Sequence, residues 1–464
     1  MKRRDFLKQT THLGAAASLA LVGPRVARAV ERADALKAGE GTVDITPPVG
    51  TVMSGFHYSP GNERRIEGVR QPTSARALVL RAHNSEVAIL SLDILGVSGE
   101  LARRIQQRVE DRTGIPATNV RVTATHSHST PTGVYLRQWG DRPKEYLADV
   151  QQKCVVAVQR ARSDLTASEL YLGKSIAEGA NFNRTIETWK NEDAFTAAAD
   201  DSERWLDRTV HVLHFERLGG AKNLLWYHFS AHPVCFTDRN AGPDWPGVVA
   251  ETFEKSEDIT PSFLQGHIGD VNPGDGAPWL GVAETTAARL AKAIGQALRG
   301  SRKVNFDAMA MRSQEIQIPL DMALHREQIE RYRKDPQKHS DGEYVDAAFA
   351  KEWYESAAKW DAERRGLAAD ISVLTLGDLA LFFHGAELFS YYGLRIRHES
   401  PFQDTILVGY ADGFVGYLTD PLSHEKREYA AATVPKILDF PPFTPTATRS
   451  FTSDAVELLK QARA

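Results

Sequence analysis

The sequence predicts an α/β (α+β) protein, a single large domain with a mixed β-sheet core flanked by helices. Three observations favour this class. Apolar runs of period two alternate with helical runs through most of the chain, polar side chains follow four of the expected strands, and one stretch of charged helices interrupts the pattern. The 464 residues are 42% hydrophobic and contain only two cysteines, which excludes a disordered chain and a disulfide-rich scaffold.

Residues 1–29 resemble a signal for export. They have a basic start around Arg3-Arg4, an alanine-rich and weakly apolar run from His12 to Gly23, and a small-x-small cleavage site at Ala27-Arg28-Ala29. The start resembles a twin-arginine signal, although Lys2 stands where Ser or Thr is usual. We therefore expect the twin-arginine export machinery to deliver the chain to the periplasm or outside the cell. The main alternative is an uncleaved anchor.

The net charge has opposite signs in residues 1–29 and in the rest of the chain. The whole chain has a net charge of −4, and residues 1–29 carry six basic residues and one acidic residue. Residues 30–464, the expected folded domain, therefore hold 50 basic against 59 acidic residues, a net charge of −9. Such a chain has no broad basic face, so nucleic acid is excluded as a partner and at most peripheral membrane contact is expected.

The first expected elements lead directly to a pair of histidines. They are strands from Ala77 to Ala82 and from Val87 to Ile94, a helix from Glu100 to Arg112, and a strand from Val120 to Ala124. The last strand continues into Thr125-His126-Ser127-His128-Ser129. These histidines follow the carboxyl end of a strand, where α/β sheets commonly hold their functional groups.

Three later strands end in the same way. The strand from Leu224 to Ser230 precedes His232, the strand from Leu379 to Phe383 precedes His384 and Glu387, and the strand from Thr405 to Val408 leads to Tyr417. We therefore expect a metal site at the carboxyl ends of the strands. Residues 324–365 have the composition of long charged helices and are expected to form a helical insertion with a solvated face.

The histidine pattern favours zinc. His126 and His128 project to the same side of an extended chain, which suits one ligand with an acid-base partner or two ligands of one ion. His232 would add a third imidazole, and Glu387 a carboxylate, both typical of a catalytic zinc with an open position. His384 is either an alternative ligand or a core histidine. Because the sequence has no nucleophile elbow, H-E-x-x-H helix, phosphate loop or dinucleotide fingerprint, a metal-assisted hydrolase remains.

Several short motifs follow one another in a defined order. They are Gly41-Thr42-Val43-Asp44-Ile45-Thr46-Pro47, Met53-Ser54-Gly55, Thr125-His126-Ser127-His128-Ser129, His232-Pro233, Gly269-Asp270-Val271-Asn272-Pro273, Gly385-Ala386-Glu387, Gly416-Tyr417-Leu418-Thr419 and Arg427-Glu428-Tyr429-Ala430-Ala431-Ala432-Thr433. In this order they resemble the catalytic N-terminal domain of the neutral/alkaline non-lysosomal ceramidases. The resemblance extends over nearly all of residues 30–464, which we therefore expect to be one ceramidase-like catalytic domain.

The resemblance implies a site and an activity. It implies one Zn²⁺ per chain, held by His126, His232, Glu387 and Tyr417. It also implies that His128 is the general acid-base, that Tyr429 hydrogen-bonds the scissile carbonyl and that Arg184 binds the developing oxyanion, with Asp270 and Asn272 on the substrate side. The implied reaction is hydrolysis of the N-acyl amide bond of ceramide, or of a related N-acylated lipid or small molecule, by zinc-activated water.

Two departures from the family pattern keep alternatives open. Asn272 stands where the family has a serine, and only about one short helix, Asp454 to Gln461, is expected where family enzymes continue into a β-sandwich. The alternatives are a zinc esterase or other exported hydrolase on the same site, and a non-catalytic binding protein with a structural metal.

Overall fold

The computed structural model describes residues 36–464, apart from residues 60, 258, 337–346 and 362. The expected export signal, residues 1–29, lies outside the described residues. Among the helices described, none combines the length and the apolar character that a membrane crossing requires.

The larger of two main sheets is mixed. In spatial order its strands are β13 (Ser262–Gln265), β11 (Leu224–Phe229), β10 (Thr209–Arg217), β6 (Thr166–Ile176), β1 (Lys37–Asp44), β3 (Ser74–Ala82), β4 (Ser85–Leu92) and β5 (Val120–Ala124), with β15 (Arg302–Lys303) paired to β6. The edge pairs β11–β13 and β4–β5 are parallel, and the other neighbours are antiparallel. Their apolar, β-branched runs suit strands that are covered on both faces.

A second sheet lies against the first. It consists of β16 (Met309–Pro319), β17 (Gly366–Leu376), β18 (Leu379–His384) and β20 (Asp404–Val408). One apolar cluster joins the two sheets, with Leu78, Leu172 and Trp226 from the first and Leu374 and Leu381 from the second. The core is therefore a sandwich of two sheets, because alternate side chains of each strand face the other sheet.

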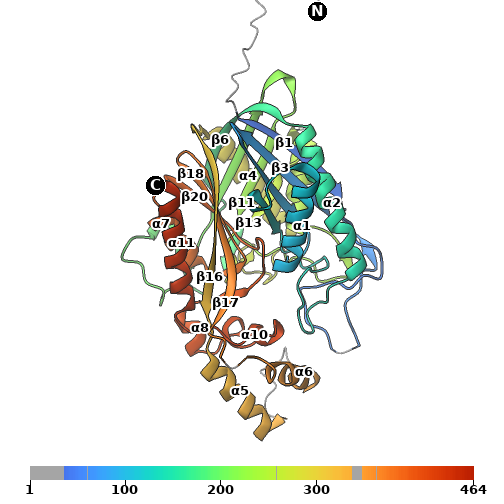
Figure 1. Ribbon diagram of the computed structural model, residues 1–464, viewed down its shortest axis with the longest axis vertical. Coiled ribbons are helices and arrows are strands. Elements are labelled where there is room, and N and C mark those ends of the chain that lie inside the picture. The colour runs from blue at the N-terminus through green and yellow to red at the C-terminus, as the bar shows by residue number, and fades with distance from the viewer. Residues whose placement is uncertain (1–35, 60, 258, 337–346, 362) are drawn as a thin grey trace, which may run out of the picture. The chain divides into compact units, whose positions relative to one another are not determined.

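Helices cover the outer faces of both sheets (Figure 1). On the larger sheet, α1 (Gly99–Thr113) and α2 (Lys144–Ser163) lie at one end, and α3 (Trp245–Glu257) and α4 (Ala283–Arg299) at the other. On the smaller sheet, α11 (Ala447–Arg463) packs against β16 and β17 and contacts α7 (Ser390–Glu399). The predicted fold class, a mixed sheet core flanked by helices, is confirmed.

Helix α1 illustrates how local sequence fixes these elements. Ser98 caps its first turn by accepting a hydrogen bond from the Leu101 amide, and Gly114 ends it in the left-handed conformation. Leu101, Ile105 and Val109 recur at helical spacing and are buried, each stabilising the fold by about 2 kcal/mol.

Short elements complete the chain near the strand ends. They are the pairs β2 (Gly68–Val69) with β12 (Asn240–Ala241), β7 (Asn181–Asn183) with β14 (Val271–Pro273), β8 (Lys190–Asn191) with β9 (Trp205–Leu206) and β19 (Ala386–Leu388) with β21 (Gly416–Leu418), and the helical turns α8 (Pro421–Glu425), α9 (Tyr429–Ala432) and α10 (Val434–Ile437). Cys154, buried in α2, and Cys235 are free thiols within the described part of the chain.

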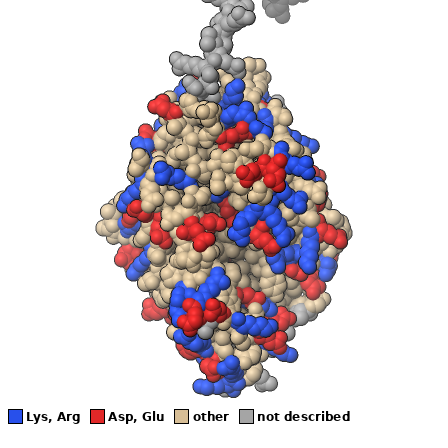
Figure 2. Space-filling view, viewed as in Figure 1, with Lys and Arg blue, Asp and Glu red and all other residues tan. Residues whose placement is uncertain are grey.

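The charged stretch between β16 and β17 contains two helices, α5 (Met322–Lys334) and α6 (Ala347–Ala357). The surface of the face in Figure 2 carries basic and acidic side chains interspersed with one another. Alternating signs of this kind do not create a field that would attract a polyanion to that face.

Candidate metal centre

Side chains that follow or lie on three separate strands meet at one point. The ligand atoms of His126 and His128, which follow β5, and of His232, which follows β11, all lie within 4.8 Å of one another. The carboxylate oxygen Oε2 of Glu387, on β19, lies 3.6 Å from Nε2 of His126 and 3.6 Å from Nε2 of His232. The predicted metal site at the carboxyl ends of the strands therefore has a matching cluster of side chains.

Backbone carbonyls fix the ring orientation of two of these histidines. Nδ1 of His126 lies 2.7 Å from the carbonyl oxygen of Leu95, and Nδ1 of His232 lies 2.8 Å from that of Val271. Because a carbonyl only accepts hydrogen bonds, each Nδ1 carries the proton and each Nε2 keeps a lone pair. Outer carbonyl partners of this kind are typical of metal-binding histidines.

The spacing of the donor atoms fits a metal ion. Ligands about 2.1 Å from a tetrahedral zinc are separated from each other by roughly 3.4 Å, close to the 3.6 Å between Glu387 and each histidine. Nε2 of His232 is also buried without a hydrogen-bond partner among the described residues. A buried lone pair without a partner is costly, and a cation between these groups would satisfy it.

Tyr417 joins the cluster through its pairing with Glu387. The two residues are register partners in the parallel pair β19–β21, and the Tyr417 hydroxyl hydrogen-bonds to the Glu387 carboxylate. Arg184 donates from Nη2 to the phenol oxygen of Tyr417 at 2.7 Å. Tyr410, which sequence reasoning missed, donates to Oε2 of Glu387 at 3.1 Å. These contacts bring together the four side chains that the family resemblance implies as ligands, with Arg184 beside them.

Burial governs the protonation of these groups. Desolvation lowers the pKa of His126 to about 3 and holds the pKa values of His128 and His232 well below their ordinary range. All three imidazoles are therefore neutral at pH 7, the form that binds metals. Burial raises the pKa of Glu387 to about 7, although Arg184 opposes the shift. A bound dication would favour the carboxylate form.

His128 differs from its neighbours in how it is held. Its Nε2 lies 3.3 Å from Nε2 of His126, but its Nδ1 has no hydrogen-bond partner among the described residues. Instead, the ring packs against the backbone of Gly55, where an added Cβ would lie 2.6 Å from Nδ1. The ring is thus positioned against the Gly55 backbone, and its Nε2 faces the cluster, where it can exchange a proton.

The predicted substrate-side residues form a network beside Arg184. Asn272 accepts from Nη1 of Arg184 at 3.3 Å and donates to the carbonyl of Trp279 at 2.9 Å. Asp270 is 1% exposed, and its carboxylate accepts from Asn183 and from the backbone and hydroxyl of Ser390. Asp270 therefore holds the neighbouring segments in place, whereas Asn272 directly contacts the Arg184 guanidinium.

A narrow cavity of about 50 Å³ opens onto the cluster. Its polar lining consists of Tyr429, His126, His128, Glu387 and Tyr417. Its other walls are Gly55, Leu95, Leu136, Trp139, Phe414, Val434 and Ile437. The rings of Tyr429 and Tyr417 are 6.4 Å apart. The cavity has room for the reacting group of a substrate but not for a whole lipid, so any acyl chain must extend out of it.

Comparison with known proteins identifies the family. The family model for the N-terminal region of neutral/alkaline non-lysosomal ceramidases matches residues 36–296, more than half of the chain. The chain belongs to this family. Its fold resembles the crystal structure of neutral ceramidase from Pseudomonas aeruginosa, with a TM-score of 0.72 and 16% identity over 93% of this chain and 75% of that chain. A ceramidase complexed with C2 gives a TM-score of 0.70 at the same identity and coverage. No curated protein matches the sequence.

One further residue supports the site of this ceramidase-family chain, and sequence reasoning missed it. Gln265, at the end of β13, donates from its amide nitrogen to the carbonyls of Thr125 and Ala231, which directly precede His126 and His232. His384, considered as an alternative ligand, is buried apart from the described metal group, with Nδ1 accepting from the Ala386 amide. It borders His228 and His267 instead.

Proposed function

We propose that this chain is an exported, zinc-dependent amidohydrolase that cleaves the N-acyl amide bond of ceramide or a related N-acylated lipid. The observation that carries the proposal is the convergence of His126, His232, Glu387 and Tyr417 in a chain of the ceramidase family. The donor set suits zinc, which prefers imidazole and carboxylate ligands in catalytic sites.

Three side chains around the cluster have separate tasks in amide hydrolysis. When bound, zinc acts as a Lewis acid that polarises a carbonyl and lowers the pKa of water. His128 is neutral and borders the ligands, so it can accept a proton from water and pass it to the leaving amine. The Arg184 guanidinium lies beside Tyr417, where it can hold the negative charge that develops on the carbonyl oxygen. Tyr429 lines the cavity and is proposed to hydrogen-bond that same oxygen.

Metal analysis combined with an assay of matched substrates tests the proposal. The purified chain is expected to contain about one zinc per molecule and to hydrolyse short-chain N-acylsphingosine, with activity lost on chelation and restored by zinc. Esters with the same acyl chains are assayed in parallel. Hydrolysis of the esters alone would replace the amidase with a zinc esterase, and a zinc-bound chain inactive on both substrates would indicate a structural metal.

The ligand set has its own test. His232→Ala and Tyr417→Phe are expected to weaken zinc retention during dialysis against a chelator, because each removes one donor atom from the cluster. His128→Ala is expected to retain zinc and to lose amide turnover, because His128 is assigned to proton transfer. Equal zinc retention in the wild type and in His232→Ala would contradict the ligand set. Unchanged turnover in His128→Ala would contradict the acid-base role.

Export is proposed from residues 1–29 alone. Cell fractionation of the full chain is expected to find the protein in the periplasm or the medium, with an N-terminus close to Ala29. Replacing both Arg3 and Arg4 with lysine is expected to retain the protein in the cytoplasm. Secretion that is unaffected by this double substitution would argue against the twin-arginine route.

A further inference from the structure

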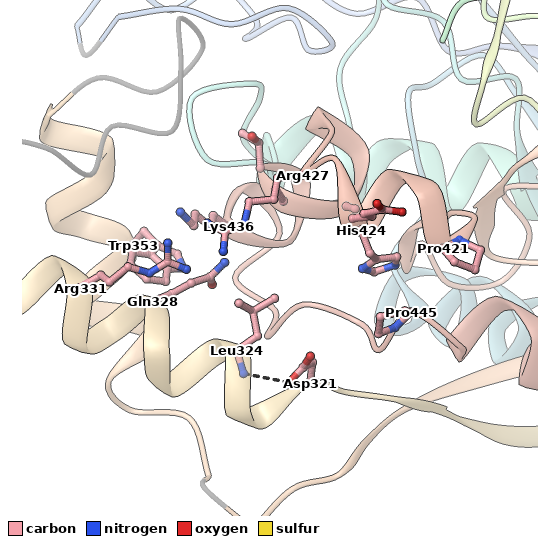
Figure 3. A pocket seen from close by; sticks show the side chains of 14 residues that line it. Asp321, Leu324, Gln328, Arg331, Trp353, Pro421, His424, Arg427, Lys436 and Pro445 are labelled. Atoms are coloured by element: carbon pink, nitrogen blue, oxygen red, sulfur yellow. Dashed lines mark hydrogen bonds between the residues drawn. The ribbon is translucent and has the colours of Figure 1, made fainter. Parts of the chain in front are cut away.

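A second cavity, of about 600 Å³, lies between α5 and the segment from α8 to α10 (Figure 3). It is separated from the metal cavity by the short helices α9 and α10. Ala432 and Thr433 of this segment line the second cavity, whereas Tyr429 and Val434 line the metal cavity. Its volume falls in the range of about 300–1,000 Å³ that is usual for sites that bind small molecules.

One end of this cavity is cationic. Arg331, Arg427 and Lys436 line that end, together with the side-chain amide of Gln328 (Figure 3). Lys436 is only 7% exposed, and its ammonium lies 4.8 Å from the centre of the Trp353 ring. Burial and the charge of Arg331 together lower the pKa of Lys436 to about 8. Positive charges held this close in a partly desolvated space favour an anion between them.

The donors of Arg331 are only partly used by the protein. Nη2 pairs with Glu327 at 3.2 Å on the exposed side of α5. Nε is buried and has no hydrogen-bond partner among the described residues. A buried guanidinium N–H without an acceptor costs free energy that an anionic ligand would recover.

The balance of charge favours a ligand with a single negative charge. The ionised residues that line the cavity are three basic and two acidic, Asp321 and Glu425, and the lowered pKa of His424 keeps its imidazole neutral. The Asp321 carboxylate accepts a hydrogen bond from the Leu324 amide at 2.8 Å and lies toward Pro445, away from the cationic end (Figure 3). Because Arg331 also pairs with Glu327, the excess of positive charge at that end is small, which suits a singly charged anion better than a polyanion.

The rest of the cavity has apolar side chains alongside the polar ones of Asp321, His424, Glu425 and Thr433. Leu324, Ala431, Ala432, Pro421 and Pro445 contribute to its walls. A cationic end followed by apolar walls matches a molecule with an anionic head and a hydrocarbon chain, because the chain leaves water as the head meets its counter-charges.

We propose that this cavity binds a long-chain carboxylate, with its head among Arg331, Arg427 and Lys436 and its chain along Leu324 and Ala431. A carboxylate of this kind is released when an N-acyl lipid is hydrolysed, so the choice of a fatty acid rests on the proposed function. The demand for a monoanionic amphiphile rests on the cavity alone.

Isothermal titration calorimetry with decanoate tests the site in the purified full chain. Decanoate is expected to bind, whereas uncharged decanol and inorganic phosphate are expected to bind at least tenfold more weakly. Arg331→Met is expected to weaken decanoate binding at least tenfold, about 1.4 kcal/mol. Arg326→Met, on the exposed side of α5, is the matched control and is expected to bind as the wild type does.

Two more variants keep the result decisive. Arg427→Met serves if Arg331→Met proves poorly folded by circular dichroism, and it too is expected to weaken binding. His232→Ala, which is designed to lose metal and turnover, is expected to bind decanoate normally, so failure of the proposed function and failure of this site are distinguishable. The proposal is overturned if decanoate does not bind, if decanol or phosphate binds as tightly, if both arginine variants bind normally, or if His232→Ala abolishes binding.

Discussion

The side-chain amide of Gln265 donates a hydrogen bond to the carbonyl of Thr125, 2.9 Å away and 140 positions earlier in the chain. The same nitrogen reaches the carbonyl of Ala231 at 3.2 Å. Since these carbonyls directly precede His126 and His232, one buried amide joins the two segments that carry the proposed imidazole ligands. The separation of those ligands therefore depends on a residue that would not itself touch the metal.

Replacing Gln265 with leucine is expected to weaken zinc binding by about 10–100-fold, the usual effect of losing an outer partner of a metal ligand. Competition with a chromophoric chelator measures the affinity. Gln151→Leu is the matched control, because Gln151 is also a buried glutamine that donates to a backbone carbonyl, but within α2 and away from the site. Equal zinc affinity in the Gln265 and Gln151 variants would show that the bridge does not position the ligands.

Two glycines on one loop allow the effect of the His128 ring position to be tested apart from the effect of backbone strain. Gly55 and Gly50 both have positive φ angles, 98° and 90°, but only at Gly55 would an added Cβ meet the His128 ring, at 2.6 Å. Gly55→Ala is expected to displace the ring and to lower turnover at least tenfold with zinc retained. Gly50→Ala carries the same backbone cost without the collision and is expected to keep turnover. Comparable losses of turnover in both variants would assign the effect to strain.

The guanidinium of Arg184 is held by three acceptors: the carbonyl of Gly269 at 2.9 Å, the Tyr417 phenol and the Asn272 side chain. Burial acts to lower its pKa, but its interactions with Tyr417 and Glu387 raise it above the ordinary value, so the group stays charged. Arg184→Gln is expected to lower kcat by about 10²–10³-fold, the usual cost of one oxyanion donor. Single-turnover assays measure this loss. Arg289→Gln, which alters contacts with Gly179 and Asp275, is the control. A similar loss of kcat in the Arg289 variant would contradict the oxyanion role of Arg184.

The placement of the candidate ligands was predictable because they follow strands with a clear apolar period, although only the family resemblance implied that Tyr417 is one of them. His126 and His232 were predicted to follow strands that the structure contains as β5 and β11, and Glu387 and Tyr417 follow β18 and β20. The alternation of apolar and polar side chains along a strand is a local property, so it can be read directly from the sequence.

The remainder depends on contacts between distant segments. The apolar periodicity of β17 and β18 does not reveal that they form a separate sheet packed on the first, since the pairing partners are chosen by long-range packing. In the same way, Gln265 and Tyr410 belong to no motif, and Gly55 lies in a motif whose spacing does not reveal its contact with His128. Their roles follow from where the chain places them, beside Thr125, Glu387 and His128 respectively.

A buried group of histidines away from the metal centre predicts sensitivity to acid. His228 is 2% exposed, and its Nε2 donates to the carbonyl of Leu407 at 2.7 Å. Its charged neighbours across the sheets are Asp207 and Arg397, and the imidazoles of His211, His267 and His384 lie near it. Burial is the main reason why the pKa of His228 falls to about 3.

The sign of the effect follows from proton binding. Between about pH 3 and 6.5 the unfolded chain binds a proton at His228 that the folded chain does not, so the free energy of unfolding falls as the pH drops below about 6.5. For a single histidine the loss at pH 5 is about 2 kcal/mol. His228→Gln retains a donor for the Leu407 carbonyl and is expected to reduce the difference in stability between pH 7.5 and pH 5 by about that amount. Urea unfolding with EDTA present throughout measures the difference without a contribution from metal release.

His398→Gln, at an exposed histidine on α7, is the control for any effect of replacing a histidine with glutamine. A pH dependence in the His228 variant as steep as in that control would show that His228 is not responsible for the acid sensitivity.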